Sequence, residues 1–199
     1  LHGDEIFLHV DLPHPRGDDE SRDREEQTEV IFVLDASGSM QGSSYRQAKR
    51  ALQIMLKALP EQARFNVLRF GSTYESLWDT SRAATPQNVE EALSYLQRSS
   101  ADLGGTEMLR PLQAIYRERP AEGAVRNVVL LTDGEIGNEE QVISLARSAP
   151  GQIRLFTVGI GYGPNDYPIR EVARASGAES VIIPPGERLE MPCLLYTSD

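Results

Sequence analysis

Two continuous apolar runs, each followed at once by carboxylate and hydroxyl residues, most constrain what this chain can fold into. Residues 30–34 read Val-Ile-Phe-Val-Leu, and residues 128–131 read Val-Val-Leu-Leu. A strand without polar alternation is covered on both faces, as in a parallel sheet that has helices on either side. The two runs therefore predict core strands of an α/β domain.

Segments with helical periodicity lie between further predicted strands. In residues 44–59, apolar side chains recur every three or four positions, and Pro60 ends the pattern. Thr85 followed by Pro86 is typical of a helix start, and Gly177 of a helix end. Strands that alternate with helices predict a doubly wound, mostly parallel, Rossmann-like sheet. The other predicted elements are strands over 65–70, 74–78 (at an edge), 153–158 and 181–183, and helices starting after Thr85, over 108–117, after a cap at Asn138, and over 166–176.

The chain divides into a central domain over residues 29–186 and two flanking segments. Residues 1–28 contain a short predicted strand at 6–12, and the chain then becomes highly charged, with little to bury. We expect this segment to be the end of an upstream module. The tail over 187–199 continues no pattern, and its last residues resemble the translated sequencing-adapter endings of raw metagenomic assemblies. We expect that tail to be artefactual.

Composition argues against several classes of protein. Asp and Glu number 30 against 20 Lys and Arg, which gives a formal net charge of −10. So acidic a domain repels phosphate backbones, which argues against nucleic-acid binding. No apolar run approaches the ~18 residues of a membrane-spanning helix, so direct membrane insertion is not expected. Cys193 is the only cysteine, which excludes an intrachain disulfide.

Polar side chains follow both apolar runs, at the ends where α/β folds bind ligands. The first run leads into Asp35, with Ser37 and Ser39 just beyond, and the second leads through Thr132 into Asp133. In open α/β sheets, ligands sit outside the carboxyl ends of the strands, where the strand order reverses. If the strand order is the common one, the two aspartates face each other across that crevice. A third loop, at 104–107, supplies the hydroxyl of Thr106 just before a helix.

This set of oxygen donors predicts a site for a divalent cation. Two adjacent carboxylates repel each other, which raises at least one pKa unless a cation neutralises them. Oxygen ligands suit hard ions, so Mg²⁺ is the predicted metal, with Mn²⁺ or Ca²⁺ as alternatives. The predicted ligands are Asp35, Ser37, Ser39, Thr106 and Asp133.

The same motifs resemble the von Willebrand factor type A domain. The Asp-x-Ser-x-Ser motif at 35–39, the Gly-Gly-Thr at 104–106 and the Thr-Asp-Gly at 132–134 match its metal-ion-dependent adhesion site, in which all five positions are kept here. The resemblance covers about residues 29–186. Residues 32–40, 104–108 and 155–161 are similar to the subgroup of inter-α-trypsin inhibitor heavy chains and their bacterial relatives, in which this domain follows a β-rich module called VIT.

The resemblance implies how such a site works. The serines bind the metal directly, Thr106 binds directly or through water, and at least one aspartate acts through water. Neutral hydroxyls leave the ion most of its charge, so a Glu or Asp of a protein partner fills the remaining position. The implied function is adhesion or scaffolding, outside the cytoplasm or at the cell envelope. The alternative is a metal-stabilised structural domain that organises a larger polypeptide.

The sequence argues against an enzyme. An aspartyl phosphotransferase needs a second aspartate where Ser37 stands, and a serine hydrolase needs a histidine, of which none follows His14. No Gly-Lys-Ser/Thr phosphate loop is present, and the glycines at 159–163 fit a dinucleotide loop poorly. We therefore expect a binding domain without catalytic residues.

Overall fold

The sheet at the centre of the molecule has the doubly wound topology that the sequence predicts. The computed structural model describes residues 28–118, 120, 124–148, 151–161 and 166–184. Within them, the strands form one sheet in the order β3-β2-β1-β5-β6-β7, with β4 paired to β2. The pairs from β2 to β7 are parallel, whereas β3 and β4 run antiparallel to β2. The strands are β1 Thr28–Asp35, β2 Arg64–Phe70, β3 Tyr74–Ser76, β4 Arg82–Ala83, β5 Val125–Thr132, β6 Ile153–Ile160 and β7 Ser180–Ile183.

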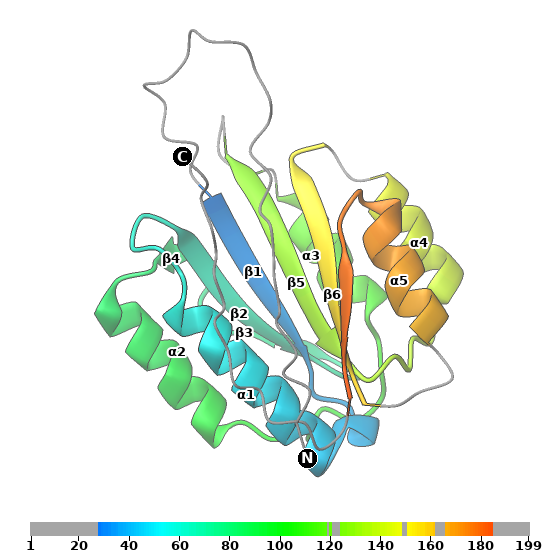
Figure 1. The fold of residues 1–199 in the computed structure, drawn as a ribbon, viewed down its shortest axis with the longest axis horizontal. Coiled ribbons are helices and arrows are strands. Elements are labelled where there is room, and N and C mark those ends of the chain that lie inside the picture. The colour runs from blue at the N-terminus through cyan, green and yellow to red at the C-terminus, as the bar shows by residue number, and fades with distance from the viewer. Residues whose placement is uncertain (1–27, 119, 121–123, 149–150, 162–165, 185–199) are drawn as a thin grey trace, which may run out of the picture.

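Helices cover both faces of this sheet (Figure 1). Residues of α1 and α2 join one apolar cluster with side chains of the sheet, and residues of α3, α4 and α5 join a second cluster on the opposite face. Alternate residues of β1, β2, β5 and β6 divide between the two clusters, as Phe32 and Val33 do in β1. The helices are α1 Ser43–Lys57, α2 Pro86–Arg98, α3 Leu109–Arg117, α4 Glu139–Arg147 and α5 Asp166–Ala175.

The strand order reverses between β1 and β5. The chain leaves β1 through α1 toward β2 on one side, and it leaves β5 through α4 toward β6 on the other. The two strands pair in register from Thr28 opposite Val125 to Leu34 opposite Leu131. The loops after β1 and β5 therefore begin side by side at the switch point, which is where α/β folds bind ligands.

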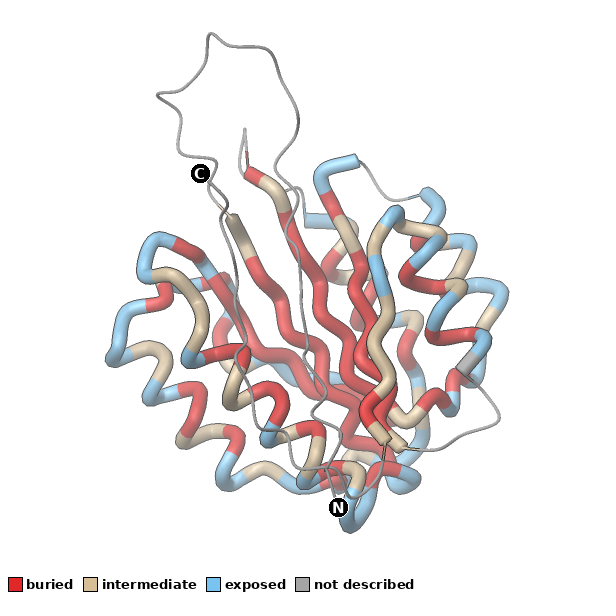
Figure 2. Tube along the Cα trace, viewed as in Figure 1, coloured by how far each residue is buried: buried red, intermediate tan, exposed pale blue. Residues whose placement is uncertain are grey.

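The core consists of the strands and the inward faces of the helices, shown in red in Figure 2. The central strands are buried along almost their whole length, as their unbroken apolar runs predict. Thr85 is the N-cap of α2, and its hydroxyl accepts the backbone N–H of Asn88. Gly177, just past α5, has a φ of +73°, a conformation that glycine adopts without strain.

The fold confirms the predicted class and differs in several details. Glu29, which the sequence places outside the apolar strand, lies in β1 and forms an ion pair with Arg126. The edge strand ends at Ser76 instead of continuing to Trp78, because Trp78 turns inward and packs edge-on against Phe65. Asn138 stands at the start of α4, but its side chain makes no capping hydrogen bond. The two-residue strand β4 was not predicted.

Some predictions lie outside the described residues. These are the strand at 6–12, the charged segment up to residue 27 and the tail at 187–199. Among the helices that the structure does describe, none combines the length and apolar character needed to cross a bilayer.

Candidate metal centre

The loop after β1 presents two hydroxyls next to a buried carboxylate. Asp35 is the last residue of β1 and is completely buried. Its Oδ1 accepts the backbone N–H of Ser37 at 2.9 Å, which turns the chain back over the end of the strand. A short 3-10 helix, Gly38–Met40, follows and brings the Oγ of Ser39 to 3.0 Å from the Oγ of Ser37. The sequence pattern did not predict this helical turn, which is what makes the two hydroxyls converge.

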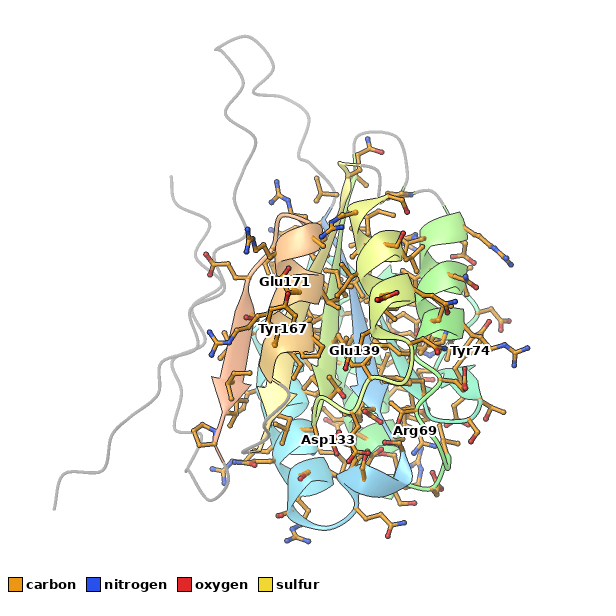
Figure 3. All side chains as sticks on the ribbon, turned by 90° about the vertical axis from the view of Figure 1, so that its right-hand side faces the viewer. Arg69, Tyr74, Asp133, Glu139, Tyr167 and Glu171 are labelled. Atoms are coloured by element: carbon orange, nitrogen blue, oxygen red, sulfur yellow. The ribbon has the colours of Figure 1, made fainter. Side chains whose placement is uncertain are left out.

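The loop after β5 supplies the second carboxylate and an additional hydroxyl. Thr132, the last residue of β5, donates its hydroxyl to Oδ2 of Asp35 at 2.7 Å. Asp133 follows and is partly exposed, and its Oδ1 accepts the N–H of Glu135 at 3.3 Å. Figure 3 shows Asp133 at the end of the sheet to which the strands point. Thr132 was not among the predicted ligands, although its place directly before Asp133 was a signal for a role at the site.

The third loop is held against the first by backbone hydrogen bonds. The N–H of Gly38 donates to the carbonyl of Gly104 at 2.7 Å, and the N–H of Leu103 donates to the carbonyl of Ala36 at 3.0 Å. Gly104 has a φ of +81°, a conformation that glycine adopts without strain, and the chain therefore turns two residues before Thr106. The three loops with the predicted ligands are thus joined at one edge of the sheet, and Thr106 is placed there by its backbone.

The electrostatics of the site favour a cation. Burial raises the pKa of Asp35 from 3.8 to about 6, although hydrogen bonds from Ser37 and Thr132 lower it. The nearby carboxylate of Asp133 raises it further. A buried carboxylate with a raised pKa is destabilised in its charged form, and a bound cation would remove that cost.

The donor set fits a hard divalent ion. Adjacent ligands of an octahedral magnesium ion, each about 2.1 Å from the metal, lie about 3.0 Å apart. The separation of the Ser37 and Ser39 hydroxyl oxygens is 3.0 Å, so both can serve one ion from neighbouring positions. In the part of the chain that the structure describes, no three His, Cys, Asp or Glu side chains gather as a metal cluster. The candidate therefore depends on hydroxyl oxygens, which soft metals disfavour.

Two further carboxylates lie in these loops. Glu107 and Glu135 are both exposed, which indicates that their charges are solvated. The backbone N–H of Glu107 donates to the carbonyl of Gly71 at 2.8 Å, which fixes the end of the third loop to the chain after β2.

Comparison with known proteins decides the family. The sequence model of one protein family, the von Willebrand factor type A domain, matches residues 28–180. The chain belongs to this family. It is 39% identical over 175 residues to the human von Willebrand factor A domain-containing protein 5A, a match that covers 83% of this chain and 22% of that protein. The chain thus spans only about a fifth of the relative's length.

Solved structures agree with the fold. A von Willebrand factor type A protein from Catenulispora acidiphila aligns with a TM-score of 0.71 and 26% identity, over 79% of this chain and 39% of that one. The manganese-loaded TRAP protein of Plasmodium vivax aligns with a TM-score of 0.60 and 24% identity, over 75% of this chain and 63% of that one. The narrower resemblance to inter-α-trypsin inhibitor heavy chains, with its VIT module and bacterial relatives, stays a prediction.

Proposed function

We propose that this domain binds a divalent cation, Mg²⁺ in the first instance, and uses it to capture an acidic side chain of a protein partner. The observation that carries the proposal is the pair of hydroxyl oxygens 3.0 Å apart beside the buried Asp35, at the switch point of the sheet. The manganese in the Plasmodium vivax relative supports a divalent metal in this family without fixing its identity here.

The proposed ligands differ in burial and in the role proposed for each. Asp35 is buried and has both carboxylate oxygens in hydrogen bonds, so it would act on the metal through its charge and by orienting Ser37. Ser37 and Ser39 would bind directly, and Thr106 and Asp133, which are partly exposed, would complete the protein's share on the solvent side. The metal would supply Lewis acidity toward an incoming carboxylate, and no catalytic residue is proposed.

Capture of a carboxylate can be tested without knowing the partner. Acetyl-glutamate amide is titrated into protein loaded with Mn²⁺, and the relaxation rate of water protons is followed, with acetyl-glutamine amide as the uncharged control. The proposal predicts that the glutamate compound displaces a metal-bound water and lowers the relaxation rate, whereas the glutamine compound does not. Equal responses to both compounds, or to neither, would refute partner capture.

A structural role for the metal is the second candidate, and the burial of Asp35 favours it. A cation that neutralises this carboxylate stabilises the fold whether or not any partner binds, by roughly 2.7 kcal/mol at a hundredfold excess over its dissociation constant. Under this alternative, Mn²⁺ raises the melting temperature but acetyl-glutamate amide leaves the relaxation rate unchanged. Location outside the cytoplasm or at the cell envelope is part of the first proposal and rests on family resemblance alone.

A further inference from the structure

The segment between α2 and α3, residues 99–108, carries Thr106 and is held at both ends. Its second half is tied to the other loops of the site through the backbone of Leu103 and Gly104, as described above. Ser72, in the chain after β2, accepts the N–H of Gly105 on its hydroxyl at 2.8 Å, and its own N–H donates to the carbonyl of Leu103 at 2.6 Å. The second half of the segment is therefore positioned by the loops that follow β1 and β2.

The first half of the segment is held by one buried arginine. Arg69 lies next to last in β2, and its side chain is only 7% exposed. Its Nη1 donates to the carbonyl of Ser100 at 2.9 Å and lies 3.5 Å from the carboxylate of Asp102. Figure 3 shows Arg69 at the same end of the sheet as Asp133. The guanidinium therefore reaches the segment four to six residues before Thr106.

The same guanidinium also joins the surrounding elements. Its Nε and Nη2 donate to the carboxylate of Glu75 in β3, at 2.9 and 2.6 Å. Its Nε also donates to the hydroxyl of Tyr95 in α2 at 3.1 Å, and its Nη1 donates to the hydroxyl of Tyr45 in α1 at 3.3 Å. Tyr45 in turn donates to the hydroxyl of Ser99. One side chain thus connects a strand, an edge strand, two helices and the segment that carries a predicted metal ligand.

Burial of a charged group is costly unless that group is fully hydrogen-bonded. The hydrogen bonds that satisfy the buried guanidinium of Arg69 also hold the 99–108 segment. Arg126 offers a comparison within the same chain. It is also buried, with a side chain 5% exposed, and it pairs with Glu29 and donates to two backbone carbonyls, of Ile115 and Glu118. Arg126 stands near the start of β5, however, whereas Arg69 stands near the end of β2, where the site lies.

We propose that Arg69 is a positioning residue for the metal centre, because it fixes the 99–108 segment and thereby the place of Thr106. The effect on metal affinity rests on the proposed function, whereas the effect on the segment does not. Replacement of groups that support metal ligands weakens metal binding by roughly 10- to 100-fold, and we expect the lower end here because Arg69 acts through the backbone.

The test compares Arg69→Met with Arg126→Met as the matched loss of a buried arginine. Hydrogen exchange is measured on the metal-free proteins, and the dissociation constant of Mn²⁺ by paramagnetic resonance. In Arg69→Met, we expect the amides of Leu103 and Gly105 to exchange at least roughly tenfold faster than in wild type, after correction for any change in the exchange of β5. We also expect Mn²⁺ to bind roughly tenfold more weakly. In Arg126→Met we expect no change in the exchange of Leu103 and Gly105 relative to that of β5. We also expect no change in the dissociation constant of Mn²⁺. If a methionine variant does not fold, the pair Arg69→Lys and Arg126→Lys replaces it.

The outcomes separate this proposal from the proposed function. Equal protection of Leu103 and Gly105 in the two variants, relative to β5, overturns the positioning role whether or not metal binds. Selective loss of protection with unchanged Mn²⁺ affinity overturns the link to the metal. A wild-type protein that binds no Mn²⁺ overturns the proposed function, and the exchange data still decide whether Arg69 positions the segment.

Discussion

Asp35→Asn provides a direct measure of how much the buried carboxylate costs the metal-free protein. The pKa of Asp35 is raised by burial to about 6 in the folded state, against 3.8 as its ordinary value. Each unit of difference corresponds to about 1.4 kcal/mol, so the two-unit rise corresponds to about 3 kcal/mol. Asparagine keeps the shape and cannot ionise, but its Nδ2 cannot accept the hydroxyl of Thr132 as Oδ2 does, so the charge is isolated by how the difference between the two proteins changes with pH.

The sign follows from which state holds the proton. Well below pH 3.8, Asp35 is protonated in both folded and unfolded chains. As the pH rises toward 6, the unfolded chain releases its proton first, so the favourable contribution of the protonated carboxyl is lost. The free energy of unfolding of the wild type, relative to that of Asp35→Asn, should therefore fall by about 2 kcal/mol between pH 4 and pH 7, the rest of the loss lying below pH 4.

The assay is urea unfolding of both metal-free proteins at pH 4, 5, 6 and 7. Glu61→Gln, which removes an exposed carboxylate, controls for the loss of one negative charge. Added Mg²⁺ should recover most of the deficit of the wild type at pH 7 and none in Asp35→Asn if that residue's charge is what the ion neutralises. A difference between the two proteins that stays flat or grows with pH would refute this account of the site's electrostatics.

Three further predictions concern the scaffold. Thr85→Ala removes the hydroxyl that accepts an N–H at the start of α2 and should cost about 1 kcal/mol, seen as a melting temperature lower by roughly 2–4 °C. Arg126→Met leaves Glu29 without its charge partner and should lower the free energy of unfolding in urea by roughly 3–5 kcal/mol. The double variant Glu29→Met/Arg126→Met should lower it by less than the single change does. An equal or larger loss in the double variant would show that the two residues are not coupled through the ion pair. Gly71→Ala would place a Cβ 2.4 Å from atoms of Leu103, so calorimetry should show a loss of roughly 1–3 kcal/mol together with weaker Mn²⁺ binding, and wild-type values for both would contradict the close approach.

The central sheet was predictable because its strands are covered on both faces. The apolar runs at 30–34 and 128–131 have no polar interruption, and the helices between the strands have clear periodicity. The strand β4 was not predictable, since two residues, Arg82 and Ala83, show no pattern. Trp78 was assigned to an edge strand because apolar alternation does not reveal where a chain turns into the core.

The meeting of the loops that carry the candidate ligands was predictable, but the contacts that support these loops were not. The positions of Asp35 and Asp133 follow from the ends of two neighbouring strands, which sequence and topology together determine. The hydrogen bond from Thr132 to Asp35 and the contacts of Arg69 join residues up to 97 positions apart, and no local pattern encodes them. Arg69, an arginine among the apolar residues of a predicted core strand, was the available signal, because a buried charge requires partners.

Isothermal titration of Mg²⁺ and Mn²⁺ into chelator-treated protein tests the metal centre most directly. Wild type is compared with Asp133→Ala and with Glu135→Gln, a matched loss of an exposed carboxylate two residues away. The account predicts saturable one-to-one binding in wild type and in Glu135→Gln, and its loss in Asp133→Ala with the fold retained. No saturable binding in the wild type, or unchanged affinity in Asp133→Ala, would contradict the assignment of the metal centre.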